Sequence, residues 1–437
     1  MQSSQRKVCS AIAFVIAAMG ASAAMAQVGP TIIGGGSSLV GPSIQSEISL
    51  FPVSQGAFTY FITSSGVGQT AFLGNNPAAF QAGLTGTVDF ANSDSALSSA
   101  QITAYQAALG ATDGPLIQIP YIVTPITIPI VGAPAVPTDS TTPQTTPGQT
   151  HSIALNDDDL CGVFSGRITD WAGTGPTHAN AIINPDTGAA YTTTATPIKV
   201  VYRSDSSGTS ELLTRHLAAV CSTSNSAVTF VDSTTFAASF PGGVVPGNFV
   251  PATGSGNVRA SLVAASGSAV GYLSPDFANT FLAPSSVSAS PALAVASLFN
   301  STTKADVAPT AANATTALGT VTPPTGNTAT SPAATQTNWV PNSGNPTAGY
   351  PVSGTSQIIV SQCYASPAVT SAVLGFLNDH YTSASFQAIV LGNGFNTVPS
   401  NFQASIVNDF LSASSRNNPT TLNIGNATVC KTPIAGR

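Results

Sequence analysis

The stretch Val200–Glu211, which reads VVYRSDSSGTSE, contains residue types that could bind a small anion. Its first residues are typical of a β-strand, Ser206–Gly208 interrupt that strand, and leucines then recur at helical spacing. A helix that begins in this way offers free backbone N–H groups, and hydroxyl groups and Arg203 stand beside them. This combination suits a tetrahedral oxyanion, although an ordinary turn between a strand and a helix shows the same pattern.

The same order of strand, small polar turn and helix occurs three times in the N-terminal part of the chain. Residues 31–42, TIIGGGSSLVGP, predict a strand and a glycine-rich turn before a helix at 43–50. A strand at 57–62 precedes TSSGVGQTAFL, and GTVDFANSDSAL at 86–97 precedes a helix at 98–109. Strands that alternate with helices indicate an α/β fold with a largely parallel sheet. Ligands bind at the carboxyl ends of such strands, where these turns lie.

Two further segments are needed to organise these units. Residues 116–131 are apolar and β-branched, and their prolines make them a poor helix, so we expect one long crossing strand. Residues 157–169 predict a helix whose first turn contains Asp157, Asp158 and Asp159. We interpret these acids as favourable charges at a helix N-terminus, and a calcium site is the alternative.

The C-terminal third begins with residues 308–345, which are dominated by Thr, Ala, Pro and Asn and predict a flexible region. A strand at 356–364 and helices at 367–381 and 402–411 are expected to follow.

The composition limits the classes of partner. Only 6% of the residues are charged, and the formal net charge is −6. Nucleic acids and anionic membranes need a basic surface, so we exclude both. An anion site in this chain must therefore rely mainly on backbone and hydroxyl dipoles.

The N-terminus has the features of a secretory signal peptide, residues 1–26. Arg6 and Lys7 precede an apolar run, and the small residues Ala24 and Ala26 mark the expected cleavage site. No cysteine follows directly, which argues against a lipid anchor. We expect the mature protein in the periplasm or outside the cell.

Four cysteines remain after Cys9 leaves with the signal peptide, and an even number in an exported chain suggests two disulfides. Three pairings are possible. We favour Cys161–Cys221 and Cys363–Cys430, because each closes a loop within one region of the sequence.

Signatures of catalysis are not found in the sequence. It has no GxSxG, GxxxxGK[ST] or HExxH motif. The histidines His151, His178, His216 and His380 are scattered, and we interpret them as packing or surface residues. We therefore expect no catalytic residue, no metal site and no cofactor.

Seven stretches together resemble the high-affinity phosphate-binding proteins of bacterial phosphate uptake, and most closely the secreted DING-type branch. They are GGGSSL, GTVDFANSDSAL, LCGVFSGRITDW, VVYRSDSSGTSELLTRHL, GYLSPDFA, YPVSGTSQIIVSQCY and LNIGNATVC. They cover nearly the whole chain in the family's order. Each would be weak alone, but the set is specific.

The resemblance implies a two-lobed periplasmic-binding-protein fold of type II, with crossing strands between the lobes. Lobe one would comprise residues 27–130 and 350–437, and lobe two residues 131–349, including the flexible region. The favoured cysteine pairing then places one disulfide in each lobe, as in the DING-type pattern.

The resemblance also implies a phosphate site. Most residues of this site would donate a hydrogen bond to the anion from a hydroxyl or N–H group. These residues are Ser38, Leu39, Ser65, Asp94, Arg203, Ser207, Gly208 and Thr209. Ser64 is the alternative to Ser65, and Asp205 matches an acid that positions the arginine. DING-type members usually have threonine at the position of Ser38, so serine is a departure that keeps the hydroxyl.

Asp94 would make the site selective, because it can accept a hydrogen bond from a protonated phosphate. Sulfate carries no proton at neutral pH and would meet Asp94 as an unpaired like charge. Without the resemblance, we would interpret Asp94 as a residue that caps a turn.

We therefore expect a monomeric binding protein that captures inorganic phosphate, with a membrane phosphate ABC transporter as a candidate partner. Three other hypotheses stay open: a secreted phosphatase that uses the same pocket, an extracellular structural or interaction protein on this fold, and a binding protein for arsenate or molybdate.

Overall fold

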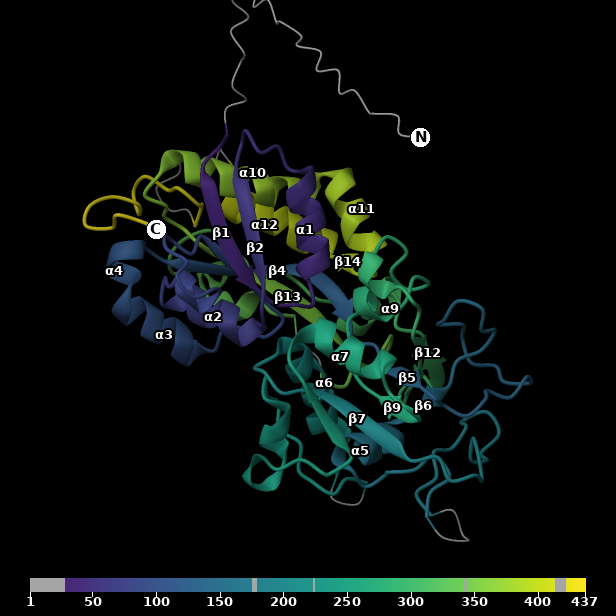
Figure 1. Ribbon diagram of the computed structural model, residues 1–437. Coiled ribbons are helices and arrows are strands. Elements are labelled where there is room, and N and C mark those ends of the chain that lie inside the picture. The colour runs from purple at the N-terminus through teal and green to yellow at the C-terminus, as the bar shows by residue number, and fades with distance from the viewer. Residues whose placement is uncertain (1–27, 175–178, 223–224, 342–343, 413–421) are drawn as a thin grey trace, which may run out of the picture.

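Two mixed sheets, each with helices packed against it, form the two lobes of the computed structural model (Figure 1). The described residues are 28–174, 179–222, 225–341, 344–412 and 422–437. The expected signal peptide and His178 lie outside them. The mixed α/β fold with two lobes confirms the predicted fold class.

The first sheet has the strand order β14-β4-β13-β3-β1-β2. Strand β1 is parallel to β2 and β3, whereas β13 is antiparallel to β3 and β4. The carboxyl ends of β1, β2 and β3 therefore meet at one edge. The strands are β1 (Thr31–Gly36), β2 (Ala57–Ile62), β3 (Phe90–Ser93), β4 (Leu116–Pro125), β13 (Ser353–Ser361) and β14 (Asn396–Thr397).

Helices cover both faces of this sheet (Figure 1). On one face lie α1 (Gly41–Leu50), α10 (Pro367–Thr382), α11 (Ala384–Gly392) and α12 (Ser400–Ile406). On the other lie α2 (Ser65–Leu73), α3 (Ser99–Ala108) and α4 (Gly110–Asp113). Serine hydroxyl groups cap three of these helices at their N-termini, which explains where the helices begin. The caps are Ser64, Ser98 and Ser366.

The second sheet has the order β10-β5-β9-β7-β8, with β7 parallel to both β8 and β9. Its strands are β5 (Pro129–Val131), β7 (Ile198–Arg203), β8 (Phe249–Ala252), β9 (Ser268–Val270) and β10 (Ala294–Val295). A smaller sheet contains β6 (Ala154–Leu155), β11 (Ser297–Asn300) and β12 (Ala305–Val307). The helices in this part of the chain are α5 (Asp157–Ser165), α6 (Gly208–Val220), α7 (Gly254–Val263), α8 (Pro275–Ala278) and α9 (Ala311–Leu318).

The segment 116–131 crosses between the sheets, but as two strands and not as the single strand predicted. Strand β4 belongs to the first sheet and β5 to the second. Pro125 and Pro129 border the break, and neither has an N–H group to continue a strand ladder. Between them, Thr127 forms a bridge with Leu273 of the second lobe.

Most predicted elements occur close to their expected bounds. The strand at 57–62 is β2, and the helices at 43–50 and 98–109 are α1 and α3. The helix expected at 157–169 ends at Ser165, because Gly166 adopts a left-handed conformation with φ of 80°. The helix expected at 402–411 begins at Ser400 and finishes as a π-helical turn over Val407–Leu411.

The prediction of a flexible region at 308–345 is wrong for its described residues. Helix α9 buries Ala314 and Leu318 against Val123 of β4. Trp339 is buried, and its ring centroid lies 5.2 Å from that of Phe410. Its indole N–H donates to the carbonyl of Ala333. Small Ala and Thr side chains let this segment lie close to the first sheet. It therefore packs on lobe one and not in lobe two, where the domain prediction placed it.

Both expected disulfides are present. Cys161–Cys221 joins α5 to the end of α6, and Cys363–Cys430 joins the end of β13 to the C-terminal segment. The capping interpretation of the acidic run is also confirmed, because Asn156 and Asp159 form a reciprocal capping box at α5.

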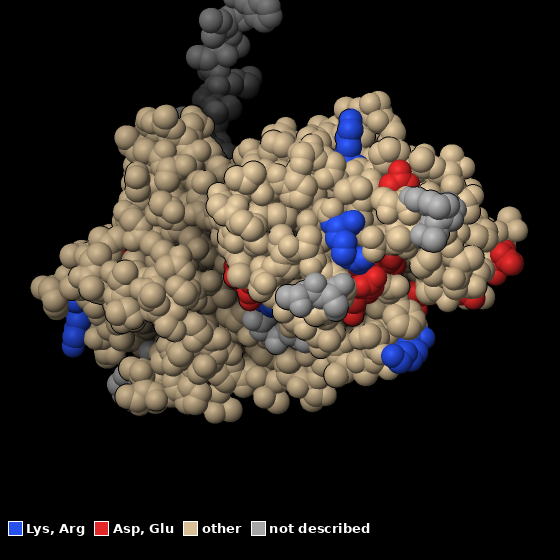
Figure 2. Space-filling model, turned by 90° about the horizontal axis from the view of Figure 1, so that it is seen from below, with Lys and Arg blue, Asp and Glu red and all other residues tan. Residues whose placement is uncertain are grey.

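The protein surface reflects the low content of charged residues. Figure 2 shows a face on which Lys, Arg, Asp and Glu are few and most of the surface is uncharged. Within the described part of the chain, no helix is long and apolar enough to cross a membrane.

Candidate functional site

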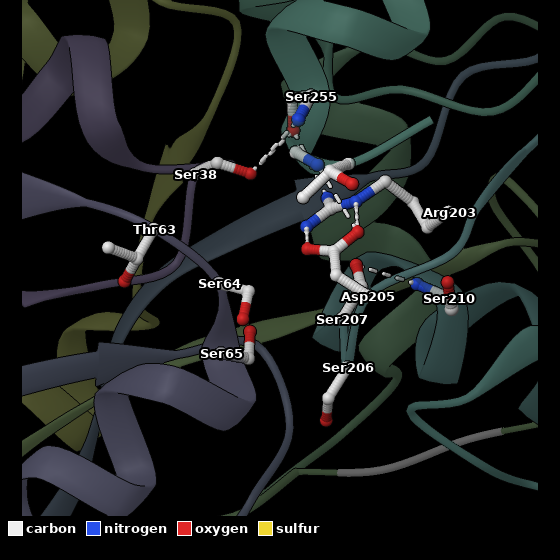
Figure 3. Close-up of polar contacts among 12 residues, drawn as sticks. Ser38, Thr63, Ser64, Ser65, Arg203, Asp205, Ser206, Ser207, Ser210 and Ser255 are labelled. Atoms are coloured by element: carbon white, nitrogen blue, oxygen red, sulfur yellow. Dashed lines mark hydrogen bonds and ion pairs between the residues drawn. The ribbon is translucent and has the colours of Figure 1, made fainter. Parts of the chain in front are cut away.

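The predicted site residues come from turns at the carboxyl ends of strands in both sheets. Strands β1, β2 and β3 supply residues from one lobe, and β7 and β8 supply them from the other. Figure 3 shows Ser38, Ser64 and Ser65 on one side and Arg203, Asp205 and Ser255 on the other, with the hydroxyl group of Ser38 directed toward Ser255. The site therefore lies where the lobes meet.

Asp94 is the acid of this site, and it is almost completely enclosed, with 3% of its surface exposed. The hydroxyl group of Ser37 donates to its carboxylate, at 2.7 Å from Oδ1 and 2.8 Å from Oδ2. Ser65 Oγ lies 3.3 Å from Oδ2 and accepts the N–H of Asp94 at 3.2 Å. Burial raises the pKa of Asp94, and the hydrogen bond from Ser37 and the charge of Arg203 offset this only in part.

The two candidate serines of the second turn have different positions. Ser64 is the N-cap of α2, where its hydroxyl accepts the N–H of Val67 at 3.3 Å. Ser65 instead directs its hydroxyl to Asp94. Both side chains are buried, so the structure brings both to the site, and Ser65 lies closer to the acid.

Ser38 and Leu39 follow strand β1. Ser38 Oγ lies 3.0 Å from Ser255 Oγ and accepts the N–H of Ser255 at 3.1 Å, which links the two lobes directly. The N–H of Leu39, which we expected to face the anion, donates to Ser37 Oγ at 3.1 Å.

Arg203 ends strand β7, and 2% of its side chain is exposed. Its Nε donates to Asp205 Oδ1 at 2.7 Å, and Nη2 pairs with Oδ2, so the carboxylate holds the guanidinium from one edge. Nη1 lies 3.4 Å from Ser255 Oγ. Although burial alone would raise the pKa of Asp205, the hydrogen bonds and charge of Arg203 hold it below its ordinary value. This geometry is that of an arginine positioned by its neighbouring acid.

The N-terminus of α6 supplies Ser207, Gly208 and Thr209. Ser207 caps the helix by accepting the N–H of Ser210 at 3.3 Å. Thr209 is 1% exposed, and its hydroxyl has no hydrogen-bond partner among the described residues. A buried hydroxyl without a partner is costly, and its place here is consistent with a group that completes its bonding when an anion binds.

Gly208 lies against Asp94 of the opposite lobe. A Cβ atom on Gly208 would stand 2.6 Å from the Cβ of Asp94 and 2.5 Å from the backbone nitrogen of Ser95. Only glycine allows this approach, so the first residue of α6 lies directly against the backbone and Cβ of Asp94. Other contacts join the lobes nearby: the N–H of Gly66 donates to Ser206 O at 3.2 Å, and Ser95 donates to Glu211.

Two residues of the site were not predicted from the sequence, Ser37 and Ser255. Ser37 lies in the same GGGSSL turn as Ser38. The sequence therefore located the turn, but it did not show that the side chain of Ser37 points toward Asp94. Ser255 follows β8 in the order strand, Thr-Gly-Ser turn and helix. That order repeats the pattern of the other turns and could have been used to find it.

The described histidines form hydrogen bonds with residues outside the predicted site. No group of three His, Cys, Asp or Glu residues in the described part of the chain could hold a metal ion. His216 and His380 are buried and pair with Asp157 and Glu47, respectively, and His151 bonds the carbonyl of Thr142.

Comparisons with known proteins agree with this arrangement. Residues 21–378 match the model of a PBP superfamily domain. Alkaline phosphatase L of Pseudomonas aeruginosa is 35% identical over 404 residues, which cover 92% of this chain and 93% of that protein. A phosphate-binding protein from an unknown prokaryotic organism is 35% identical over 405 residues, or 89% of this chain and 97% of that one.

Solved structures extend the comparison to the fold. A high-affinity periplasmic phosphate-binding protein, PfluDING, with bound phosphate has a TM-score of 0.72 and 34% identity. A phosphate-binding protein from Stenotrophomonas maltophilia has a TM-score of 0.72 and 31% identity. Each match covers 93% of this chain and 99% of the other. The chain therefore belongs to the PBP superfamily, and within it to the phosphate-binding proteins of the DING type.

Proposed function

We propose that the protein binds inorganic phosphate between its two lobes with high affinity, for phosphate scavenging or uptake. The observation that carries this proposal is the contact between Asp94 and the N-terminus of α6. A helix N-terminus and a buried arginine favour an anion, whereas a carboxylate repels one. An oxyanion that carries a proton satisfies both, because it accepts from the donors and donates to Asp94.

The donors present suit phosphate near neutral pH, where it carries one or two protons. Arg203 supplies a permanent charge, and Thr209, Ser38 and Ser65 supply hydroxyl groups. Each charge-assisted hydrogen bond contributes about 1.5–3 kcal/mol. Several such bonds in a closed site are sufficient for tight binding. Tetrahedral oxyanions of similar protonation, such as arsenate, are expected to compete.

The test is calorimetry on protein from which bound anion has been removed by unfolding, dialysis and refolding. We expect one phosphate per chain, and little binding of sulfate at neutral pH. Arg203→Ala should weaken phosphate binding by about 100-fold or more, since it removes the charge and at least two hydrogen bonds. Arg167→Ala is the control, because Arg167 pairs with Asp158 away from the site. Absent phosphate binding, or equal affinity for sulfate, would contradict the proposal.

A second candidate function is hydrolysis of phosphate monoesters, which the similarity to alkaline phosphatase L favours. Turnover of a generic phosphomonoester by pure protein, lost in Arg203→Ala, would support it. Turnover that persists in that variant would assign the activity to a contaminant or to another site.

We also infer export to the periplasm or beyond, and delivery of phosphate to a membrane ABC transporter. The apolar N-terminal run and the family membership support these inferences. N-terminal sequencing of the mature protein should begin at Gln27. Phosphate uptake by a deletion strain, measured with and without the gene, tests the transporter.

A further inference from the structure

Strand β13 passes directly beside the acid of the anion site. It is antiparallel to β3, with Gln357 opposite Ser93. The same register, continued by one residue, places Ser356 opposite Asp94. The ladder between β13 and β4 shifts at the step from Ser356 to Gln357, and irregularities of this kind often redirect a side chain.

The same side of β13 also meets the second lobe. A Cβ atom on Gly354 would stand 2.5 Å from Cδ2 of Leu212, so α6 lies directly on the strand at this point. Residues two apart on a strand face the same side, and Ser356 therefore faces the side on which α6 lies. Because the first residue of α6 lies against Asp94, this is the side of the anion site.

The hydroxyl group of Ser356 is close to Asp94 but is not bonded to it. The side chain is fully buried, and its hydroxyl has no hydrogen-bond partner among the described residues. Burial raises the pKa of Asp94, whereas the hydroxyl groups of Ser37 and Ser356 oppose this rise. A buried donor without a partner is costly, so we expect this hydroxyl to bond in another state of the site.

The hydrogen bonds of Ser65 indicate which state that is. A hydroxyl group carries one proton, and Ser65 directs its proton to Asp94 Oδ2 at 3.3 Å. The proposed phosphate site uses the same proton for the anion. When Ser65 donates to phosphate, Asp94 loses this donor and keeps that of Ser37. A carboxylate has about four lone-pair sites, so another hydroxyl can then bond to it.

We propose that Ser356 donates a hydrogen bond to Asp94 while an anion is bound, in place of the bond that Ser65 then gives to the anion. Ser356 is thus a positioning residue. It acts through Asp94 and keeps this carboxylate as the acceptor for the proton of the bound oxyanion. This inference rests on the proposed phosphate function and adds to it a residue that supports the selectivity of the site.

The test compares Ser356→Ala with Ser361→Ala. Both serines are fully buried on β13, but Ser361 lies at the other end of the strand and donates to the carbonyl of Asp113 at 3.0 Å. Calorimetry should show phosphate binding about tenfold weaker in Ser356→Ala, and changed by less than about twofold in Ser361→Ala. Urea unfolding of the phosphate-free proteins should show the reverse. Ser361→Ala loses a formed hydrogen bond and should unfold at lower urea, whereas Ser356→Ala should not.

A second comparison shows whether Ser356 acts through the acid. In Asp94→Asn the acceptor is uncharged, and a hydrogen bond to it contributes less. Adding Ser356→Ala to this variant should therefore change phosphate binding by less than about twofold. A loss of about tenfold in both backgrounds would show that Ser356 does not act through Asp94.

The outcomes separate this inference from the proposed function. Phosphate binding that Ser356→Ala leaves unchanged would overturn the inference alone. Absence of phosphate binding by the unchanged protein would overturn both. A lower urea midpoint for phosphate-free Ser356→Ala would assign the hydroxyl to the stability of the fold and would contradict the inference.

Discussion

The hydroxyl group of Ser37 lies within hydrogen-bond distance of both carboxylate oxygens of Asp94. One donor shared by two oxygens fixes the plane of the carboxylate and stabilises its charge inside a closed site. It also leaves lone pairs of Asp94 available to a further donor, which would be the proton of the bound oxyanion. Ser37 is therefore a positioning residue that acts through Asp94.

Replacement of Ser37 should show this role directly. We expect Ser37→Ala to lower phosphate affinity by about tenfold or more, because a hydrogen bond to a charged group contributes about 1.5–3 kcal/mol. Calorimetry with phosphate and sulfate measures the change. Ser43→Ala is the control, since Ser43 is also fully buried and its hydroxyl has no partner among the described residues. Equal affinities in Ser37→Ala and Ser43→Ala would refute the assigned role.

Asp94→Asn should reduce the selectivity of the site for phosphate over sulfate more than it reduces the stability of the folded protein. The variant removes the charge that repels sulfate and adds an amide that can donate to it. We expect phosphate binding to weaken by about tenfold and sulfate binding to become measurable. Titration of the variant with each anion at neutral pH gives the ratio of affinities. An unchanged ratio would show that Asp94 does not select the protonated anion.

Asp205→Asn should weaken phosphate binding without contacting the anion. The change removes the charge that holds Arg203, so the guanidinium is free to reorient. We expect a loss of about tenfold, smaller than that of Arg203→Ala. Binding constants for both single variants and the double variant form a cycle. If Asp205 acts only through Arg203, the double variant should bind no worse than Arg203→Ala; additive losses would contradict this.

Asp159 should make the stability of the second lobe depend on pH. Burial raises its pKa to about 7, so the folded protein retains a proton that the unfolded chain releases above about pH 4. The free energy of unfolding should therefore fall as the pH rises from about 4 to 7, by at most about 1.4 kcal/mol per unit from this group. Asp159→Asn should remove that slope in urea unfolding.

Asp186 provides the control for this measurement. Hydrogen bonds from Thr141 and Ser140 outweigh its slight burial and hold its pKa below the ordinary value. Asp186→Asn should thus change stability by a similar amount at every pH between about 4.5 and 6.5. If Asp159→Asn keeps the slope of the unchanged protein, the assignment to Asp159 fails.

The sequence was sufficient for elements whose pattern is local. Strand β2, helix α1 and the turn between β7 and α6 follow from hydrophobic periodicity, small polar residues and capping. The residues of the site could be named because each follows the end of a strand. Their role as phosphate ligands came from the family resemblance, and it remains a prediction that the binding experiments test.

What the sequence did not predict depends on contacts between distant segments. Ser255 joins the site through Ser38, which lies 217 residues away. Segment 308–341 has a composition typical of disorder, yet Leu318 packs against the first sheet and Trp339 packs against Phe410. The break between β4 and β5 lies between two prolines. It could be located only once the structure showed that the strands on either side pair in different sheets.

The close approach of Gly208 to Asp94 has a kinetic consequence. Because the lobes touch at the anion site itself, an enclosed ligand cannot leave through a side opening at that contact; it must wait until the lobes separate. The residence time of the ligand is then governed by how often the lobes open. Gly208→Ala should shorten this residence time, because the added methyl group would push the lobes apart. A partner that stabilises the open form would unload the protein without altering a single ligand contact.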